Sequence, residues 1–202
     1  DVWEHSVRAT GQVPAEPVLR WSTLLHDCGK PACKTVDEKG IGHFYGHPAV
    51  SRELSEGILT RLRFSNEDSA RILLLVEQHD RPFGDTDKLL RRRLSRIGEA
   101  RFRDLLAIKK GDVVGQGTHP GDIAWLYDME QRLNRVLAED ACLSLRQLAV
   151  DGNDIKALGL SGPAVGEMLQ ALLDAVIDEQ TDNTREALLA CARARMEERH
   201  DE

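Results

Sequence analysis

Several histidines and aspartates stand where predicted helices should face a core. His79 and Asp112 each continue by one turn the apolar stripe of a predicted helix. An unpaired buried carboxylate is costly, so a core-facing aspartate needs a partner. The adjacent His26 and Asp27 end a third apolar helix, where an imidazole and a carboxylate can bracket one ion from two directions. A bound metal ion would satisfy all of these side chains.

The chemistry of such a site follows from its ligand types. Imidazole and carboxylate together suit borderline or hard divalent cations, here Mn²⁺, Fe²⁺, Co²⁺, Ni²⁺, Zn²⁺ or Mg²⁺. An ion of this kind can activate water and polarise a phosphoryl oxygen. The residue types therefore predict hydrolysis of a phosphate ester, with the identity of the metal open.

Each of these residues also has a simpler interpretation. His5 could be an exposed helix residue, His79 could cap a helix end, and His47 could cap the next helix. Asp112 could form an ion pair with Lys109. Only the ordered set favours a metal site. The other histidines are expected in loops or the tail: His43, His119 and His200.

The elements that would position these residues are predicted to be helices, because apolar residues recur with helical spacing almost everywhere. The fold class expected is all-α. Residues 35–45 contain a turn signal and could form a small hairpin or loop, and residues 144–160 look partly irregular. Helices are predicted over residues 18–28, 48–62, 87–97, 99–114, 122–139, 163–177 and 183–198, with another after Ser65 that carries Ile72, Leu75 and Val76 on one face.

Length and composition limit the possible classes of protein. The chain has 202 residues, 41% of them hydrophobic, and a net charge of −7, which suits one large domain or two small ones. No apolar run reaches the roughly 18 residues of a membrane span, and the four cysteines form no C-x-x-C pair. We expect a cytoplasmic protein without a membrane partner, cut from a longer chain. The glycine-rich break at 115–121 predicts domains over 1–117 and 118–202.

Basic residues concentrate in one part of this acidic chain. Between residues 88 and 110 there are nine basic and two acidic residues, a local balance of +7. Such a concentration could follow an RNA phosphate backbone, although a solvated helix face or an interdomain contact would explain it equally well. The candidate RNA-binding residues are Arg91, Arg92, Arg93, Arg96, Arg101, Arg103, Lys109 and Lys110, which follow Lys88.

The order of an isolated histidine, an adjacent His-Asp pair and a distal aspartate resembles the HD superfamily of metal-dependent phosphohydrolases. The resemblance implies that four residues hold a first metal ion: His5, His26, Asp27 and Asp112. It implies that His47 and His79 help to bind a second metal or the substrate phosphate, and that Lys30 contacts the phosphate.

Two longer stretches resemble a narrower family, the bacterial tRNA nucleotidyltransferases of the CCA-adding and poly(A) polymerase type. Residues 24–31 and 42–48 are similar to its HD-containing region, and residues 151–173 and 183–189 to its C-terminal tRNA-binding region. The resemblance implies an HD-domain helical bundle followed by a helical tRNA-binding region. It also implies two partners, tRNA and an N-terminal nucleotidyl-transfer head, whose Gly-Ser motif and paired aspartates are missing from this sequence.

The leading hypothesis is the HD and tRNA-binding part of a CCA-adding-type tRNA nucleotidyltransferase. Its HD site would hydrolyse phosphomonoesters or 2′,3′-cyclic phosphates, with Asp27 at the metal and with Lys30 and His79 stabilising phosphate charge. One alternative is a non-catalytic RNA-binding scaffold with a relic HD site. A free-standing HD nucleotidase is a third hypothesis, which residues 153–189 disfavour. The choice between CCA addition, A-addition and poly(A) synthesis would lie in the missing head.

Overall fold

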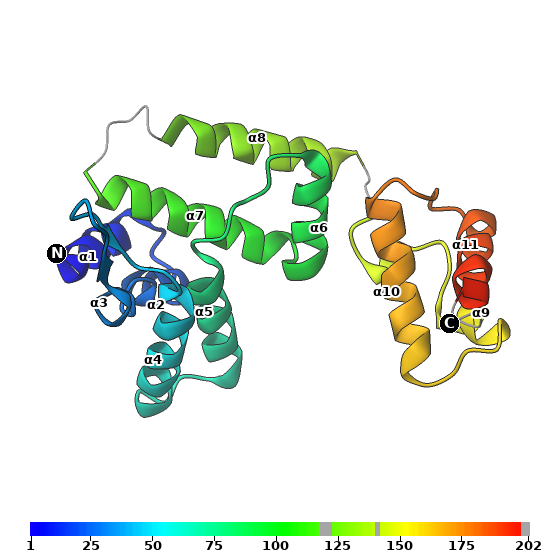
Figure 1. The fold of residues 1–202 in the computed structure, drawn as a ribbon, viewed down its shortest axis with the longest axis horizontal. Helices are drawn as coiled ribbons and strands as arrows, with labels where there is room; N and C mark the ends of the chain where they lie inside the picture. Colours follow the sequence, from blue (N-terminus) through cyan, green and yellow to red (C-terminus); the bar gives the residue numbers. More distant parts are fainter. Residues whose placement is uncertain (118–122, 140–141, 199–202) are drawn as a thin grey trace. The chain divides into compact units, whose positions relative to one another are not determined.

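The structure is a computed structural model that describes residues 1–117, 123–139 and 142–198 (Figure 1). Nearly all regular structure in these ranges is α-helical, which confirms the all-α prediction. His119 and His200 lie outside the described residues. No helix in the described ranges is long and apolar enough to cross a membrane.

The chain divides into two compact units. Unit 1 comprises Asp1–Pro82 and Gly98–Gln131, and unit 2 comprises Phe83–Ile97 and Arg132–Glu202. These ranges differ from the domain boundary predicted between residues 117 and 118. The helix over residues 87–97 shares its unit with the C-terminal helices, and residues 123–131 share theirs with the N-terminal ones.

Unit 1 is built from helices and carries one small, largely exposed hairpin. Its side-chain core comes from α2, α5 and α7, with Ile72, Leu75, Phe102 and Leu105 fully buried. The elements are α1 (Val2–Gln12), α2 (Pro17–Leu25), α3 (Lys30–Cys33), β1 (Thr35–Val36), β2 (Gly42–His43), α4 (His47–Arg61), α5 (Asn66–Gln78), α7 (Glu99–Gly115) and the first part of α8 (Ala124–Ala138).

Local sequence signals explain several helix starts in unit 1. The Asp1 side chain accepts a hydrogen bond from the Glu4 backbone N–H at 2.9 Å, and Ser65 accepts one from the Asp68 N–H at 3.0 Å. Pro48 lies in the first turn of α4, where its missing N–H costs nothing. The predicted helices at these positions are confirmed, whereas α1 was not predicted as a helix.

Residues 35–45 form the small hairpin that the turn signal allowed. β1 pairs with β2 in antiparallel fashion, with Thr35 opposite His43. The Asp37 carboxylate closes the turn by accepting the backbone N–H groups of Lys39 and Ile41, each at 2.9 Å. The hairpin leads directly into α4, so it fixes where α4 begins.

Two glycines allow α1 and α7 to pack closely. A Cβ atom on Gly115 would lie 2.8 Å from the backbone N of Ala9, and one on Gly111 would lie 2.9 Å from the Ala9 carbonyl oxygen. Any side chain at these positions would therefore separate the helices. The close approach brings His5 of α1 within reach of Asp112 of α7.

Unit 2 has a separate apolar core. Ile155, Leu172 and Leu188 are fully buried in it, and Met168 and Leu173 pack around them. The Asp151 side chain and the Asp154 side chain form a capping box at the start of α9. The elements are α6 (Asp87–Ile97), the second part of α8, a 3-10 turn (Leu145–Gln147), α9 (Gly152–Ala157), α10 (Pro163–Ile177) and α11 (Arg185–Glu198).

Candidate metal centre

The predicted metal ligands of unit 1 converge in space. They come from α1, from the turn after α2, from the first residue of α4, from the residue after α5 and from α7. Their potential ligand atoms form two groups, and within each group all lie within 4.8 Å of one another. The first group is His5, His26, Asp27 and Asp112, and the second is Asp27, His47 and His79.

The first group surrounds two carboxylates with two imidazoles. His5 Nε2 lies 3.0 Å from Asp112 Oδ1 and 3.7 Å from Asp27 Oδ2. His26 Nε2 lies 3.2 Å from Asp27 Oδ2 and 3.6 Å from Asp112 Oδ1. His26 and Asp27 are each only 1% exposed. This arrangement offers two nitrogen and two oxygen ligands to one ion.

The second group shares Asp27 with the first. His47 Nε2 lies 3.3 Å and His79 Nε2 lies 3.6 Å from Asp27 Oδ1, the carboxylate oxygen that the first group does not use. The two Nε2 atoms of His47 and His79 are 3.2 Å apart. Asp27 can therefore bridge two ions, one in each group.

Backbone carbonyls orient three of the imidazoles. Since a carbonyl oxygen only accepts, the facing Nδ1 must carry a proton, and Nε2 is the nitrogen turned toward Asp27, available to a metal when it carries no proton. This is the usual second interaction of a metal-binding histidine. The contacts are His26 Nδ1 to Thr23 O at 2.6 Å, His47 Nδ1 to Phe44 O at 2.9 Å and His79 Nδ1 to Val76 O at 2.7 Å.

Buried acceptor atoms without partners provide a test of whether a metal fits. Among the described residues, His5 Nε2, His26 Nε2 and Asp27 Oδ1 are buried and have no hydrogen-bond partner. Such atoms cost free energy unless a cation or a donor approaches them. All three face the interior of the two groups, and nitrogen with oxygen ligands suits the divalent ions predicted from the sequence. The residues present therefore fit a divalent metal.

The pKa shifts describe a strongly negative site. Burial opposes a charge on His26, but the carboxylates of Asp112 and Asp27 outweigh it and raise the pKa of His26 to about 9. Burial likewise opposes ionisation of Asp27 and Asp112, yet the neighbouring His26 imidazole and the nearby lysines hold both pKa values far below the usual range. Burial lowers the pKa of His47. The site thus retains its carboxylates as anions and attracts a cation or a proton.

A glycine places the His26-Asp27 turn against α4. A Cβ atom on Gly29 would lie 2.6 Å from the backbone N of Ser51 and 2.7 Å from the His47 carbonyl oxygen. The Gly29 N–H donates to Ser51 Oγ at 2.9 Å. The close contact brings Asp27 and His47 together.

Two lysines neutralise part of the negative charge. Lys30 Nζ lies 2.6 Å from Asp27 Oδ2, and Lys109 Nζ lies 2.9 Å from Asp112 Oδ2. The alternative that Asp112 pairs with Lys109 is therefore observed, but the pair uses only one oxygen of Asp112, and the other faces His5.

Two cavities adjoin the cluster. One of about 290 Å³ lies beside His5 and Gln116, and one of about 390 Å³ lies beside Lys30, His47 and the hairpin. The second cavity is large enough for a phosphate ester, and it exposes Lys30 next to the ligands of the second group. The second cavity therefore reaches the candidate metal centre at His47.

Some contributors to the site were not predicted from the sequence. Gln116 Nε2 donates to Asp112 Oδ1 at 3.1 Å and fixes that carboxylate. The roles of Gly29 and of the backbone carbonyl groups of Thr23, Phe44 and Val76 could not be predicted from residue type, because none of them acts through a side chain. One sequence feature could have indicated the contacts with Thr23 and Val76. His26 and His79 are each the first residue after a helix, and such a residue can turn its ring back to the carbonyl three positions earlier.

The basic side chains of α6 form ion pairs within unit 2. Arg91 lies 2.9 Å from both Glu139 and Glu179, and Arg92 makes a double contact with Asp178. Lys88 Nζ lies 3.4 Å from the same Asp178. Arg93 stacks over the Phe83 ring at 5.1 Å. These contacts give Lys88, Arg91 and Arg92 a structural role that differs from both the solvated face and the interdomain contact considered from the sequence.

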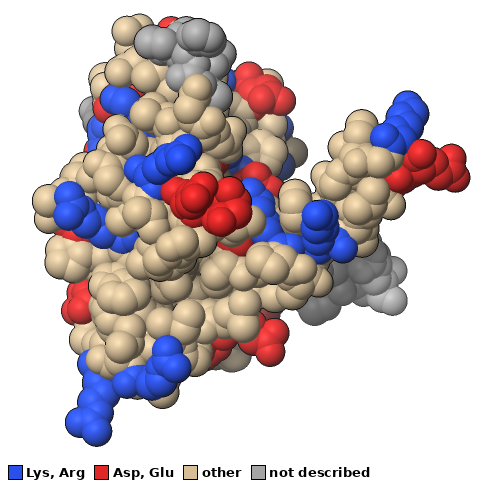
Figure 2. All heavy atoms as spheres, turned by 90° about the vertical axis from the view of Figure 1, so that its left-hand side faces the viewer, with Lys and Arg blue, Asp and Glu red and all other residues tan. Residues whose placement is uncertain are grey.

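The basic side chains of α7 lie in unit 1. Arg103 donates to Glu99 at 2.8 Å, and Lys110 Nζ lies 4.5 Å from the centre of the Tyr127 ring. Arg96 of α6 and Arg101 of α7 are exposed. On the face turned to the viewer in Figure 2, basic side chains lie among acidic and uncharged ones and form no single continuous patch among the described residues.

Comparisons with known proteins give a consistent result. A family model described as tRNA nucleotidyltransferase domain 2 matches residues 50–192, a range that includes His79 and Asp112. The chain is 35% identical over 187 residues to the A-adding tRNA nucleotidyltransferase of Deinococcus radiodurans, covering 87% of this chain and 42% of that relative. It is 31% identical over 194 residues to the CC-adding tRNA nucleotidyltransferase of Thermus thermophilus, covering 92% of this chain and 43% of that relative. The chain thus spans less than half the length of these relatives.

Proposed function

The chain belongs to the tRNA nucleotidyltransferase family, and on that premise we propose that it forms the HD-type, tRNA-binding part of such an enzyme. The proposed activity of this part is metal-dependent hydrolysis of phosphomonoesters or 2′,3′-cyclic phosphates. The observation that carries the proposal is the set of three buried, unpartnered acceptor atoms that face one another across Asp27.

Each ligand group has a proposed role. His5, His26, Asp27 and Asp112 would hold one divalent ion, and His47 with His79 would complete a second position on the other oxygen of Asp27. When bound, such an ion supplies an activated water and Lewis acidity toward a phosphoryl oxygen.

The chain's own residues then orient the substrate. Lys30, a quarter exposed and lining the cavity beside His47, can donate a hydrogen bond to a phosphate oxygen. His79 Nδ1–H is fixed on Val76 O, so Nε2 is turned toward Asp27, where it would help to bind a second ion or the substrate phosphate. The Thr23 and Phe44 carbonyls keep His26 and His47 in the orientation that the reaction requires.

The relatives suggest the partners. Both are named as tRNA nucleotidyltransferases, so tRNA is the proposed macromolecular partner of this chain, with a nucleotidyl-transfer head as the part that adds nucleotides. One relative adds A and the other CC, and the described part of this chain contains no feature that selects between them.

A second candidate function is an RNA-binding scaffold with a relic metal site. The ion pairs of Lys30 with Asp27 and of Lys109 with Asp112 favour it, since they already give each carboxylate one counter-charge. In that case the chain would bind tRNA but would have no hydrolytic turnover.

Hydrolysis assays distinguish the two candidates. The parent chain is loaded with each candidate metal in turn and assayed on a phosphomonoester and on a 2′,3′-cyclic nucleotide, beside Asp27→Ala. The exposed Asp128→Ala serves as a matched control. Turnover in the parent and in Asp128→Ala, with none in Asp27→Ala and with unchanged tRNA affinity, supports the hydrolase. Equal turnover in Asp27→Ala contradicts it.

A further inference from the structure

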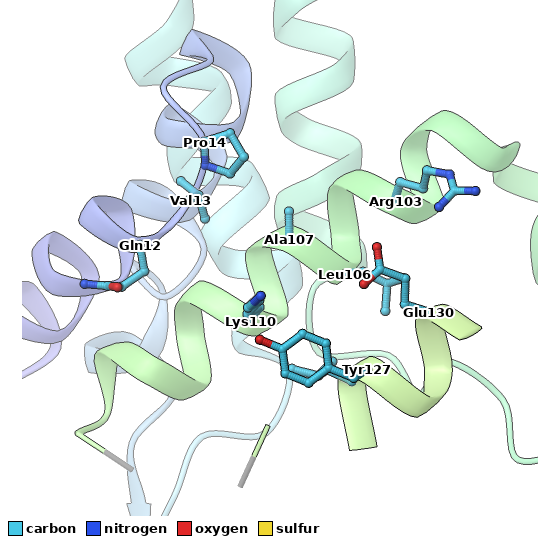
Figure 3. A pocket seen from close by; sticks show the side chains of 10 residues that line it. Gln12, Val13, Pro14, Arg103, Leu106, Ala107, Lys110, Tyr127 and Glu130 are labelled. Atoms are coloured by element: carbon cyan, nitrogen blue, oxygen red, sulfur yellow. The ribbon is translucent and has the colours of Figure 1, made fainter. Parts of the chain in front are cut away.

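A cavity of unit 1 away from the metal ligands has no role in the proposed hydrolysis. It encloses about 460 Å³ between the end of α1, one face of α7 and the first part of α8 (Figure 3). None of the candidate metal ligands lines it. Its volume is in the range of pockets that hold a small organic molecule.

The wall of the cavity is apolar and contains one aromatic ring. Val13, Leu106 and Leu126 are buried and form its floor. The Tyr127 ring on α8 is 46% exposed and faces the same space. A flat apolar ligand can cover this exposed ring, since stacking on an aromatic side chain is favourable for every nucleobase.

Two cations flank this wall on α7. Arg103 and Lys110 are seven residues apart, about 10 Å along the helix axis, so both lie on the side of α7 that faces the cavity. Lys110 Nζ lies over the Tyr127 ring at 4.5 Å, and Arg103 Nε donates to Glu99 in an exposed ion pair. Exposed ion pairs are weak, so the contact with Glu99 does not prevent Arg103 from binding an anion.

The separation of the two cations suits a strand better than a single phosphate. A phosphate beside Tyr127 would contact Lys110, and the next phosphate along a strand would extend toward Arg103. Glu130 lies on the cavity rim and can accept a hydrogen bond from the amino group of a base. Its negative charge disfavours a further phosphate at that point.

We propose that the cavity between α1, α7 and α8 binds one unpaired nucleotide of an RNA strand, with its base on Tyr127 and the strand phosphates on Lys110 and Arg103. This inference rests on the proposed binding of tRNA. Within the basic stretch, Arg91 and Arg92 of α6 thus pair with acidic residues of unit 2. Arg103 and Lys110 of α7 instead line the proposed binding site.

Binding of a fluorescein-labelled, single-stranded oligoribonucleotide tests the proposal in the full chain. Tyr127→Ala should weaken binding about tenfold through loss of stacking. Lys110→Gln should weaken binding and reduce the slope of log Kd against log salt by about one phosphate contact. Lys39→Gln, which alters an exposed lysine of the hairpin turn elsewhere in unit 1, should bind as the parent does.

The other outcomes each overturn a stated claim. Parent-like oligonucleotide and tRNA binding by Tyr127→Ala and Lys110→Gln overturns the cavity assignment and leaves the proposed tRNA binding intact. Failure of the parent chain to bind either RNA overturns both. If AMP binds as tightly as the oligonucleotide and tRNA does not displace it, the ligand is a free nucleotide, and the assignment to an RNA strand is wrong.

Discussion

The metal-ligand groups of unit 1 and the basic side chains of α6 in unit 2 both gather ionisable residues, but they differ in how these residues are satisfied. On α6, Arg92 and Lys88 meet Asp178, and Arg91 meets two glutamates with its terminal nitrogens, leaving only its Nε unpaired. Around Asp27, acceptor atoms face other acceptor atoms in a buried space.

This difference separates structural charge from functional charge. Oppositely charged partners on the same unit account for the α6 side chains without any ligand. Buried imidazoles whose lone pairs converge on a carboxylate require something positive between them. A cluster of charged residues in the sequence therefore says less about a binding site than does the presence or absence of a partner for each charged group in the fold.

Removing the shared carboxylate should have the largest effect. Asp27→Ala takes a ligand from both groups, so we expect its affinity for a divalent metal to fall by at least about 100-fold, the upper end of the loss seen for residues that merely orient a ligand. His47→Ala should remove only the second group. Calorimetric titration of each variant with a divalent metal measures these affinities. An equal loss of metal affinity in Asp27→Ala and in the control Asp128→Ala would contradict the prediction.

Separating α1 from α7 should have the next largest effect. Gly115→Ala places a Cβ atom 2.8 Å from the Ala9 backbone, and we expect it to lower the free energy of unfolding by about 1–3 kcal/mol and to weaken metal retention through His5. Gly11→Ala, with nothing within 4 Å, is the matched control and should be neutral or stabilising. Denaturant unfolding of both variants checks the prediction, which fails if they behave alike.

The pH dependence should differ between the metal-free and metal-loaded chain. The pKa of His26 rises from 6.5 to about 9 on folding, so its contribution to stability is complete below pH 6.5 and is lost as the pH rises through 9. Because a metal competes with that proton, metal affinity should increase over the same range. Unfolding in chelator and metal titration at several pH values test the two opposite slopes. A metal-free stability that rises with pH would contradict the assignment.

Breaking an ion pair on α6 should have the smallest effect. Arg92→Gln removes the contacts with Asp178 at an exposed site, so we expect a smaller loss of stability than for Gly115→Ala and no change in oligoribonucleotide affinity. Thermal unfolding and RNA titration measure both quantities. A marked loss of RNA affinity would contradict this prediction and would mean that Arg92 of α6 contributes to RNA binding.

The sequence was sufficient for most of the fold. Helix periodicity and start signals such as Ser65 and Pro48 act locally, so they predicted the helices that the structure confirms. The helix α1 was missed, and its packing on α7 depends on Gly111 and Gly115, about a hundred residues away. Similarly, the grouping of α6 with the C-terminal helices depends on partners that no local pattern reveals.

The candidate metal ligands could be predicted from the sequence, but the groups that orient them could not. Residue type and order identified the histidines and aspartates that the structure brings together around Asp27. The Thr23 and Val76 carbonyls that orient His26 and His79 belong to the backbone, so residue identity carries no information about them. The cavity beside Tyr127 also lacked a sequence signal, because it is formed where the end of α1 meets α7 and α8, which lie far from α1 in the chain.

The central claim is that the two groups around Asp27 bind divalent metal, and elemental analysis tests it most directly. The parent chain and Asp27→Ala are stripped with chelator, exposed to a panel of divalent metals and freed of loose ions by gel filtration. The account predicts at least one ion per parent chain and only background metal in Asp27→Ala. Background metal in both, or equal retention in both, would contradict it.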